Sequence, residues 1–420
     1  MKSGEMQKRV VKSKEASRQM AQVSSLQKNE ALRGMAGALI AAEAAILEAN
    51  QRDLAAASGG GHSAAFLDRL SLNAGRIRAM AKALEEIAAL PDPVGEVTDM
   101  TVRPNGLMVG RMRVPLGVVG IIYESRPSVT ADAAGLCLKA GNAVILRGGK
   151  EALSTNISIV DILTKEAIRA GLPRDSITLI ENPDRAAILE LLRLDQIIDL
   201  LIPRGGPELI RFVTENSRIP VIRHEKGLCH TYVDEDADQA MAEEIVINAK
   251  VERPGVCNAM ETLLVHEGIA PDFLPAVARR LEEAKVELRG CLRSRALHPS
   301  MKKAEDEDWD AEYLDLILSV RVVQDIDEAI RHIALHGSGL AEAIVTRNYF
   351  KAWRFLREVD ASSVLVNAST RFTDGGEFGM GAEIGISTQK LHARGPMGLR
   401  ELTCTKFIVL GEGQVRRSQG

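Results

Sequence analysis

Runs of consecutive apolar residues alternate with segments of helical periodicity between residues 118 and 222. Uninterrupted apolar runs are typical of strands buried on both faces of a parallel sheet. The strands expected on this basis are 118–123, 143–146, 177–180, 197–202 and 220–222, and the helices between them are 128–140, 151–170, 185–192 and 207–216. This alternation predicts an α/β fold whose first sheet is doubly wound, of the Rossmann type.

The flanking segments add helices before this sheet and a second α/β unit after it. Residues 25–57 and 74–89 carry apolar residues at helical spacing. From about residue 247, helices at 271–284 and 326–335 are expected beside short strands at 262–265, 320–323, 343–345 and 363–367. With 420 residues the chain is long enough for two or three domains.

Residues 100–114 have the character of a β-hairpin. Asn105-Gly106 lies between two short extended runs, which is a strong hairpin signal. Residues 405–410 form a further expected strand, which can pair with this hairpin. A ribbon this polar needs a packing partner, and either its own subunit or a second copy of the chain would supply one.

Composition limits the functions that this chain can have. The formal net charge is −4 at pH 7, so no overall positive field draws the chain to nucleic acid or to an anionic membrane. The five cysteines are scattered without a CxxC pair, which argues against a metal site and against a disulfide framework. No apolar run has the length of a transmembrane helix, and free thiols fit a reducing compartment, so the cytosol is the expected location.

The segment Arg253-Pro254-Gly255-Val256-Cys257-Asn258-Ala259 contains the strongest candidate for a catalytic residue. Cys257 follows a Pro-Gly break and precedes a segment that can restart as a helix. The positive end of a helix dipole would favour the thiolate, which is the nucleophilic form of cysteine. The alternative is that Cys257 is a small buried hydrophobic residue, as most free cysteines are.

Two glycine turns follow expected strands of the first sheet. Arg147-Gly148-Gly149-Lys150 follows strand 143–146, and Arg204-Gly205-Gly206 follows strand 197–202. Turns at the carboxyl ends of parallel strands are where phosphates bind in such sheets, so the pair favours a dinucleotide. Arg147 and Lys150 can meet a 2′-phosphate, which indicates NADP over NAD. Ordinary tight turns and solvated charges are the alternatives.

Several of these motifs resemble one known family. The order of elements, the sequence Pro115-Leu116-Gly117-Val118-Val119-Gly120 and the late cysteine resemble the aldehyde dehydrogenase superfamily. Within it, the chain resembles the γ-glutamyl phosphate reductases from about residue 30 to about residue 416. The motifs that carry this narrower resemblance are Tyr123-Glu124-Ser125-Arg126-Pro127, Leu146-Arg147-Gly148-Gly149, Ile202-Pro203-Arg204-Gly205-Gly206, the cysteine segment extended to Leu264, and Gly375-Gly376-Glu377-Phe378-Gly379.

The resemblance implies an activity and roles for individual residues. The activity is NADPH-dependent reduction of L-glutamate 5-phosphate to L-glutamate 5-semialdehyde through a cysteine thioester, the second step of proline biosynthesis. Cys257 matches the family's nucleophile. Arg147 matches a cation at the adenosine ribose, and Gly205 and Gly206 match a pyrophosphate-side turn. Arg253 and Asn258 are expected to bind substrate because they adjoin Cys257, although helix-start or core hydrogen-bonding roles are equally open.

The resemblance also implies a domain organisation and partners. It places an NADP-binding domain at residues 1–99 and 115–246, a catalytic domain at 247–390, and a bridging or oligomerisation element at 100–114 and 391–420. We expect a homo-oligomer, and functional association with a glutamate 5-kinase is open.

Three places depart from the wider pattern. Arg223-His224-Glu225-Lys226-Gly227 lies where hydrolytic relatives carry a water-activating glutamate in Glu-Leu-Gly-Gly, and Glu225 is within one residue of that position. Ser128 lies where the family often has Asn. Leu340 and Ala341 lie where it often has His and Ser. Two rival functions are an aldehyde dehydrogenase working in the oxidative direction and a non-catalytic NADP-binding protein.

Overall fold

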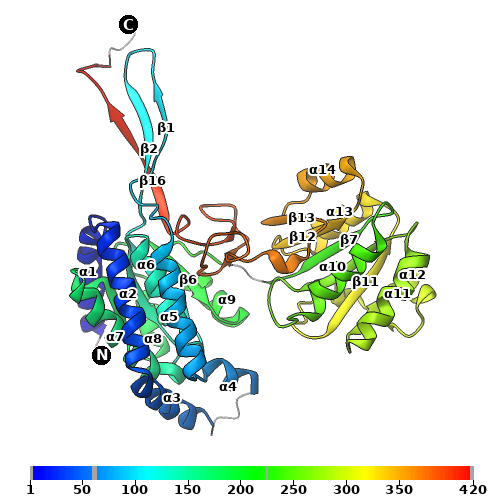
Figure 1. The fold of residues 1–420 in the computed structure, drawn as a ribbon, viewed down its shortest axis with the longest axis horizontal. Helices are drawn as coiled ribbons and strands as arrows, with labels where there is room; N and C mark the ends of the chain where they lie inside the picture. Colours follow the sequence, from blue (N-terminus) through cyan, green and yellow to red (C-terminus); the bar gives the residue numbers. More distant parts are fainter. Residues whose placement is uncertain (1–2, 59–63, 224–225, 417–420) are drawn as a thin grey trace. The chain divides into compact units, whose positions relative to one another are not determined.

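The computed structural model describes residues 3–58, 64–223 and 226–416, and the chain forms two compact units. The first unit comprises Met1–Ile222, Met380–Gly385 and Met397–Gly420, and the second comprises Arg223–Gly379 and Ile386–Pro396. Figure 1 follows the chain through both units. Each unit contains a parallel sheet of its own, and each is described by itself. The parallel sheet of the first unit was predicted from the sequence, whereas only short strands and helices were expected in the second.

The first unit is built on a sheet of four parallel strands in the order β5-β4-β3-β6. These strands are β3 (Val118–Tyr123), β4 (Ala143–Arg147), β5 (Ile177–Leu179) and β6 (Leu200–Arg204). Every residue of β3 and β4 is buried, because helices cover both faces of the sheet. The predicted doubly wound sheet is confirmed.

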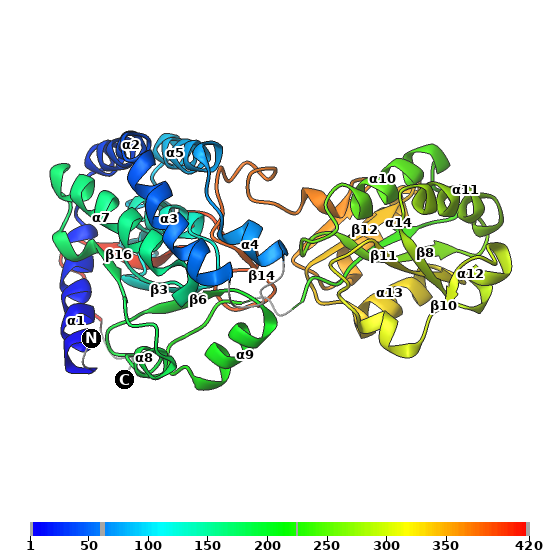
Figure 2. The same cartoon turned by 90° about the horizontal axis from the view of Figure 1, so that it is seen from below.

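The helices of this unit form layers on the two faces of the sheet (Figure 2). Helices α6 and α7 contact the sheet, and α2, α3 and α5 pack against them. On the other face, Met6 and Val10 of α1 share a buried cluster with Ile145 of β4 and Val213 of α9. The helices are α1 (Ser3–Met20), α2 (Ser25–Ala41), α3 (Glu43–Ser58), α4 (Ala64–Leu70), α5 (Ala74–Ala89), α6 (Ser128–Lys139), α7 (Leu153–Arg169), α8 (Arg185–Leu191) and α9 (Pro207–Asn216).

The second unit contains a sheet of seven parallel strands in the order β10-β9-β11-β8-β7-β12-β13. The strands are β7 (Cys229–Val233), β8 (Met260–His266), β9 (Glu287–Gly290), β10 (Lys302–Lys303), β11 (Ile317–Val323), β12 (Ala341–Val345) and β13 (Ser363–Val366). The helices are α10 (Gln239–Val251), α11 (Ala270–Glu283), α12 (Leu292–Leu297), α13 (Ile326–His336) and α14 (Tyr349–Glu358). A short antiparallel pair, β14 (Ile386–Ser387) and β15 (Gly395–Pro396), completes it.

The boundary between the two units lies earlier than the sequence analysis placed it. Residues 223–246 were assigned to the first domain, but β7 lies between β8 and β12 in the second sheet. Strand pairing across the chain decides the boundary, and a strand's partners are not visible in its own sequence.

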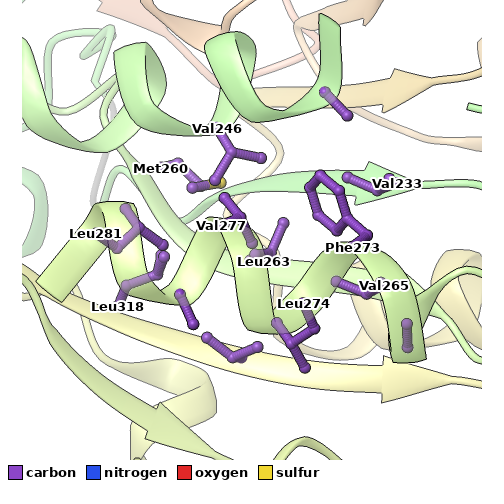
Figure 3. Close-up of a cluster of buried hydrophobic side chains, with 14 of the residues drawn as sticks. Val233, Val246, Met260, Leu263, Val265, Phe273, Leu274, Val277, Leu281 and Leu318 are labelled. Carbon is purple, nitrogen blue, oxygen red and sulfur yellow. The ribbon is translucent and has the colours of Figure 1, made fainter. Parts of the chain in front are cut away.

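Buried aliphatic side chains hold the second sheet to its helices. On one face, Phe273 and Val277 of α11 pack with Leu263 and Val265 of β8 and with Val246 of α10 (Figure 3). Each such side chain contributes roughly 1.5–3 kcal/mol relative to full exposure. Helices α13 and α14 pack on the opposite face, in a separate buried cluster.

A three-stranded antiparallel sheet forms part of the first unit. It consists of β1 (Val97–Val102), β2 (Met108–Pro115) and β16 (Thr403–Leu410), in the order β1-β2-β16. The predicted hairpin and its pairing with the C-terminal strand are therefore confirmed. Figure 1 shows these strands as a ribbon that extends away from the helices of the same unit.

Two predicted strands of the first unit differ in the structure. The strand expected at 197–202 begins only at Leu200, because the amide groups of Ile197 and Ile198 donate to the carbonyl of Leu194 in a turn. Residues 220–222 contribute a single bridge from Val221 to Leu201 instead of a strand.

Among the described residues, no helix has both the length and the apolar character needed to cross a membrane.

Candidate active site

Cys257 lies in a loop between the end of α10 and the start of β8, and its side chain is partly buried. The loop consists of turns and leads directly into the strand. The expectation of a helix after Cys257 is therefore wrong. The residues from Met260 onward are buried in the sheet between β7 and β11, so the chain must be extended there. The dipole of a following helix does not act on this thiol.

The backbone of Cys257 is held by the segment that enters β7. A Cβ atom added to Gly227 would lie 2.1 Å from the carbonyl oxygen of Cys257 and 2.6 Å from its Cα, so only glycine fits there. Two residues later, the Cys229 thiol donates to the same carbonyl over 3.3 Å. This close approach fixes the position of the Cys257 peptide relative to the sheet.

Cys229 is suited to support the loop and unsuited to act as the nucleophile. Burial raises its pKa well above the usual value, and the nearby charges of Glu342 and Cys257 raise it further. It belongs to a small buried apolar cluster with Leu340, Ala341 and Ile386, against which Cys257 packs. Leu340 and Ala341, which depart from the family pattern, thus lie in the core against which Cys257 packs.

Asn258 is engaged by the protein itself. Its side-chain amide donates to the carbonyls of Arg371 and Thr373, at 3.3 and 3.0 Å, and its oxygen accepts from the Arg371 guanidinium. The hydroxyl of Thr370 donates to the backbone carbonyl of Asn258. These contacts match the core hydrogen-bonding alternative left open by the sequence. Arg253, in the same loop, has an exposed side chain.

A buried ion pair joins the two ends of the Cys257 loop. Lys250 Nζ lies 2.6 Å from Glu261 Oε2, and both side chains are at most 1% exposed. Lys250 is in the last turn of α10 and Glu261 is the second residue of β8. Burial raises the pKa of Glu261 to about 7, although Lys250 opposes the shift. Sequence analysis did not identify this pair, because only the fold brings the two charges together.

The Cys257 loop lies at the amino edge of the second sheet. Strands β12, β7 and β8 are parallel neighbours, so the segments that precede them meet at one edge. Ser338 precedes β12, Gly227 precedes β7 and Cys257 precedes β8. The hydroxyl of Ser338 accepts from the amide of Leu228 over 3.0 Å, which links two of these segments directly. His224 and Glu225, which precede Lys226, lie outside the described residues.

Arg147, at the start of the first glycine turn after β4, is hydrogen-bonded within the protein. Its guanidinium donates to the carbonyl of Pro183 over 2.7 Å, and burial lowers its pKa while Glu151 and Glu124 oppose this shift. Its Nε atom is buried without a hydrogen-bond partner in the described part of the chain. Gly148 and Gly149 have no room for a Cβ atom, and Lys150 is exposed. A polar group from a ligand would satisfy the buried Nε atom.

The second glycine turn, after β6, begins helix α9 as predicted. Gly206 is its N-cap residue and Pro207 its first residue. The amide of Gly206 donates to the Glu124 carboxylate over 2.8 Å, so the protein's own anion occupies one donor at this helix start. Glu124 belongs to the Tyr123–Pro127 motif, and sequence analysis gave it no role.

In the same unit, burial raises the pKa of Asp132 to about 6, although Arg204 opposes the shift.

One group of possible metal ligands is already neutralised. Asp234, Glu235 and His266 lie close enough together to share an ion. The Lys351 ammonium group, however, forms ion pairs with Asp234 at 3.1 Å and with Glu235 at 2.8 Å. A cation site is disfavoured where a lysine charge already lies.

These features leave Cys257 as the candidate nucleophile of the second unit and the two glycine turns as the candidate phosphate-binding loops of the first. A thiolate on Cys257 can attack an activated carbonyl and form a thioester. The turns after β4 and β6 offer backbone amides and cations of the kind that bind a dinucleotide.

Of the other thiols, Cys137 is buried, Cys404 is exposed and Cys291 is partly buried. Although burial raises the pKa of Cys291, its hydrogen bonds with Ser294 lower the pKa overall.

Comparison with known proteins gives consistent matches over the whole chain. The sequence model of the aldehyde dehydrogenase family matches residues 1–311 and 303–408. The γ-glutamyl phosphate reductase of Caldanaerobacter subterraneus subsp. tengcongensis is 56% identical over 98% of this chain and 100% of its own length. That of Carboxydothermus hydrogenoformans is 60% identical over 96% of this chain and 98% of its own.

Solved structures agree. The γ-glutamyl phosphate reductase of Thermotoga maritima is 48% identical, with a TM-score of 0.96, over 98% of this chain and 100% of that one. An acetylating aldehyde dehydrogenase of Geobacillus thermoglucosidasius shares 17% identity, with a TM-score of 0.70, over 99% of this chain and 98% of that one. This second similarity concerns the fold alone.

Proposed function

Because the chain belongs to the aldehyde dehydrogenase family, and within it to the γ-glutamyl phosphate reductases, we propose that it reduces L-glutamate 5-phosphate to L-glutamate 5-semialdehyde with NADPH. Inorganic phosphate is the other product, and the reaction is the second step of proline biosynthesis from glutamate. The observation that carries the proposal is the partly buried Cys257 in a loop that both Gly227 and Cys229 hold in place.

Catalysis begins at Cys257. Its thiolate attacks the acyl phosphate carbon, and the backbone N–H of Cys257 donates to the oxyanion that forms. The oxyanion collapses, the carbon–oxygen bond to phosphate breaks, and a thioester remains on Cys257. NADPH, when bound, supplies the hydride that reduces this thioester. The resulting thiohemiacetal oxyanion collapses to the aldehyde and returns the electron pair to sulfur as the thiolate.

The first unit holds the cofactor in this proposal. Arg147 and Lys150 bind at the adenosine ribose and its 2′-phosphate, with Gly148 and Gly149 allowing close approach of the backbone. Gly205 and Gly206 bind on the pyrophosphate side, at the start of α9. The buried Nε of Arg147, which has no hydrogen-bond partner among the described residues, supports this assignment.

The substrate is held near Cys257 in the second unit. Arg253 remains our candidate for binding an anionic group of the substrate from the same loop. Asn258, whose amide contacts Arg371 and Thr373, acts by fixing the loop that carries the nucleophile.

We propose that the reaction takes place in the cytoplasm and that the active form of the protein is a homo-oligomer. Functional association with a glutamate 5-kinase is left open. The three-stranded sheet supports the oligomer because it exposes apolar side chains along its length. Those on β1 and β2 are Val97, Met100, Val102 and Met108, and those on β16 are Phe407, Val409 and Leu410. Exposed apolar side chains on such a ribbon favour contact with a second copy of the chain.

NADPH oxidation with enzymatically generated glutamyl phosphate tests the activity. We expect turnover in the wild type and none above background in Cys257→Ser. Cys291→Ser is the matched control and should retain activity, because Cys291 lies outside the Cys257 loop. Oxidation of glutamate semialdehyde by NADP at a rate independent of phosphate would favour an oxidative aldehyde dehydrogenase instead. An unchanged rate in Cys257→Ser would contradict the assigned nucleophile.

A further inference from the structure

A cavity of about 300 Å³, most of whose lining residues are polar or charged, lies within the second unit, apart from the residues assigned above. It is lined by Arg223, Lys226, Leu228, Gly337, Ser338, Thr388 and Gln389. Two of these residues are cations, and three others carry a hydroxyl or an amide. Among the described residues, no carboxylate lines the cavity, so these lining groups are suited to an anion.

The segment 226–229 separates this cavity from the nucleophile. Lys226 and Leu228 line the cavity, whereas Gly227 and Cys229 contact the backbone of Cys257. Alternate residues of an extended chain point to opposite sides, which explains this division. Ser338, which lines the cavity, also contacts Leu228. The cavity and Cys257 therefore lie next to each other at the amino edge of the sheet.

Lys226 and Gln389 retain hydrogen-bonding capacity for a ligand. Lys226 Nζ donates one hydrogen bond, to the carbonyl of Asp310 over 3.2 Å, and an ammonium group has three protons to donate. The side-chain oxygen of Gln389 accepts from the amide of Arg223 over 3.3 Å, which leaves the Gln389 NH₂ group as a donor on the cavity wall. Nearby, the Glu312 carboxylate accepts from the amide of Gly227 and so holds the dividing segment in place.

We propose that this cavity binds the phosphoryl group of the acyl phosphate and holds inorganic phosphate as it leaves. The inference rests on the proposed function. It specifies which part of the substrate contacts this cavity. In an acyl phosphate, a single oxygen joins phosphorus to the carbon that the thiolate attacks. The phosphoryl group must therefore lie beside Cys257, whereas the α-carboxylate is several bonds away. Arg223 and Lys226 stabilise the charge that phosphate acquires when the carbon–oxygen bond breaks.

The reverse reaction separates phosphate binding from the other steps. Oxidation of glutamate semialdehyde by NADP is measured as a function of inorganic phosphate in the wild type, Arg223→Ala, Lys226→Ala and Lys226→Arg. We expect the KM for phosphate to rise about tenfold in each alanine variant, as expected for loss of a charge-assisted contact. The KM for NADP should not change, and Lys226→Arg should recover most of the loss. Arg279→Ala, an exposed cation on α11, is the matched control and should behave as the wild type.

A second measurement does not depend on turnover. Inorganic phosphate should protect Cys257 from alkylation by iodoacetamide in the wild type and in Arg279→Ala, and protect it much less in Lys226→Ala. Thermal melting confirms that each variant is folded. A KM for phosphate that stays at the wild-type value in both alanine variants would overturn the proposal, as would a rise confined to the KM for the semialdehyde. If the wild type shows no phosphate-dependent turnover, the proposed function fails. If turnover depends on phosphate but phosphate does not protect Cys257, only the proposal that the cavity binds phosphate is refuted.

Discussion

The two units place their functional loops at opposite edges of similar parallel sheets. In the first unit, the glycine turns follow β4 and β6 at the carboxyl edge, where open α/β sheets usually bind ligands. In the second unit, Cys257 precedes β8 and lies at the amino edge. The general rule therefore leads to the candidate cofactor turns and would miss Cys257. The position of Cys257 depends on contacts between loops instead of on a helix start.

The loops also differ in what holds them. A carboxylate from the chain, Glu124, caps the amide of Gly206 in the first unit, so a ligand has to displace it or share the site. The Cys257 loop is held at its ends by a buried ion pair and in its middle by Gly227 and Cys229. The first site is thus arranged to exchange a ligand, and the second is arranged to keep one atom in place.

The largest expected effect is loss of the ion pair at the Cys257 loop. Glu261→Leu or Lys250→Met leaves its partner's charge buried without compensation and should reduce the free energy of unfolding by about 3–5 kcal/mol. The double variant Lys250→Met/Glu261→Leu should recover much of this stability. Urea unfolding of the four proteins measures the coupling, and a loss in the double variant equal to the sum of the two single losses would show that the pair is not coupled.

Gly227→Ala should reduce turnover on glutamyl phosphate about a hundredfold, because the added Cβ displaces the Cys257 carbonyl and even a shift of about 1 Å is costly. NADPH binding, measured by fluorescence, should be unchanged because the cofactor turns belong to the other unit. Gly255→Ala is the matched control in the same loop. Its added Cβ would come no closer than 3.6 Å to the Leu314 carbonyl, so its activity should stay close to that of the wild type.

Glu124→Gln should lower the Kd for NADPH a few-fold, because removing the carboxylate charge relieves repulsion of the pyrophosphate at the start of α9. Glu208→Gln, in the first turn of the same helix, is the control for a general change in charge. Weaker binding of NADPH in Glu124→Gln would show that the carboxylate orients the turn for the cofactor.

The smallest effect concerns pH. The pKa of Asp132 in the folded protein, about 6, is above its usual value of 3.8, because burial disfavours the charged form. The folded state therefore binds more protons than the unfolded state between these values. The stabilisation that Asp132 provides at low pH is lost as the pH rises from about 4 through 6. In Asp132→Asn this contribution to the pH dependence of unfolding should disappear, and an unchanged profile would contradict the raised pKa.

Much of the fold followed from local sequence patterns. The continuous apolar runs identified β3 and β4, and Asn105-Gly106 identified the hairpin of β1 and β2. The boundary between the units did not follow, because β7 joins the second sheet through partners distant in sequence. Helix α1 was not predicted either, since only a few apolar residues, such as Met6 and Val10, attach it to the sheet.

The candidate site divides in the same way. The sequence by itself determined the family and pointed to Cys257 as the candidate nucleophile and to the glycine turns at residues 147–150 and 204–206, because these are motifs of adjacent residues. Tertiary structure decided that Cys257 precedes a strand, that Asn258 contacts Arg371, and that Lys250 pairs with Glu261. It also decided that Arg223 and Ser338 line one cavity. Hydrogen bonds, ion pairs and close packing act over a few ångströms in space, so residues far apart in sequence acquire a joint role only once the chain has folded.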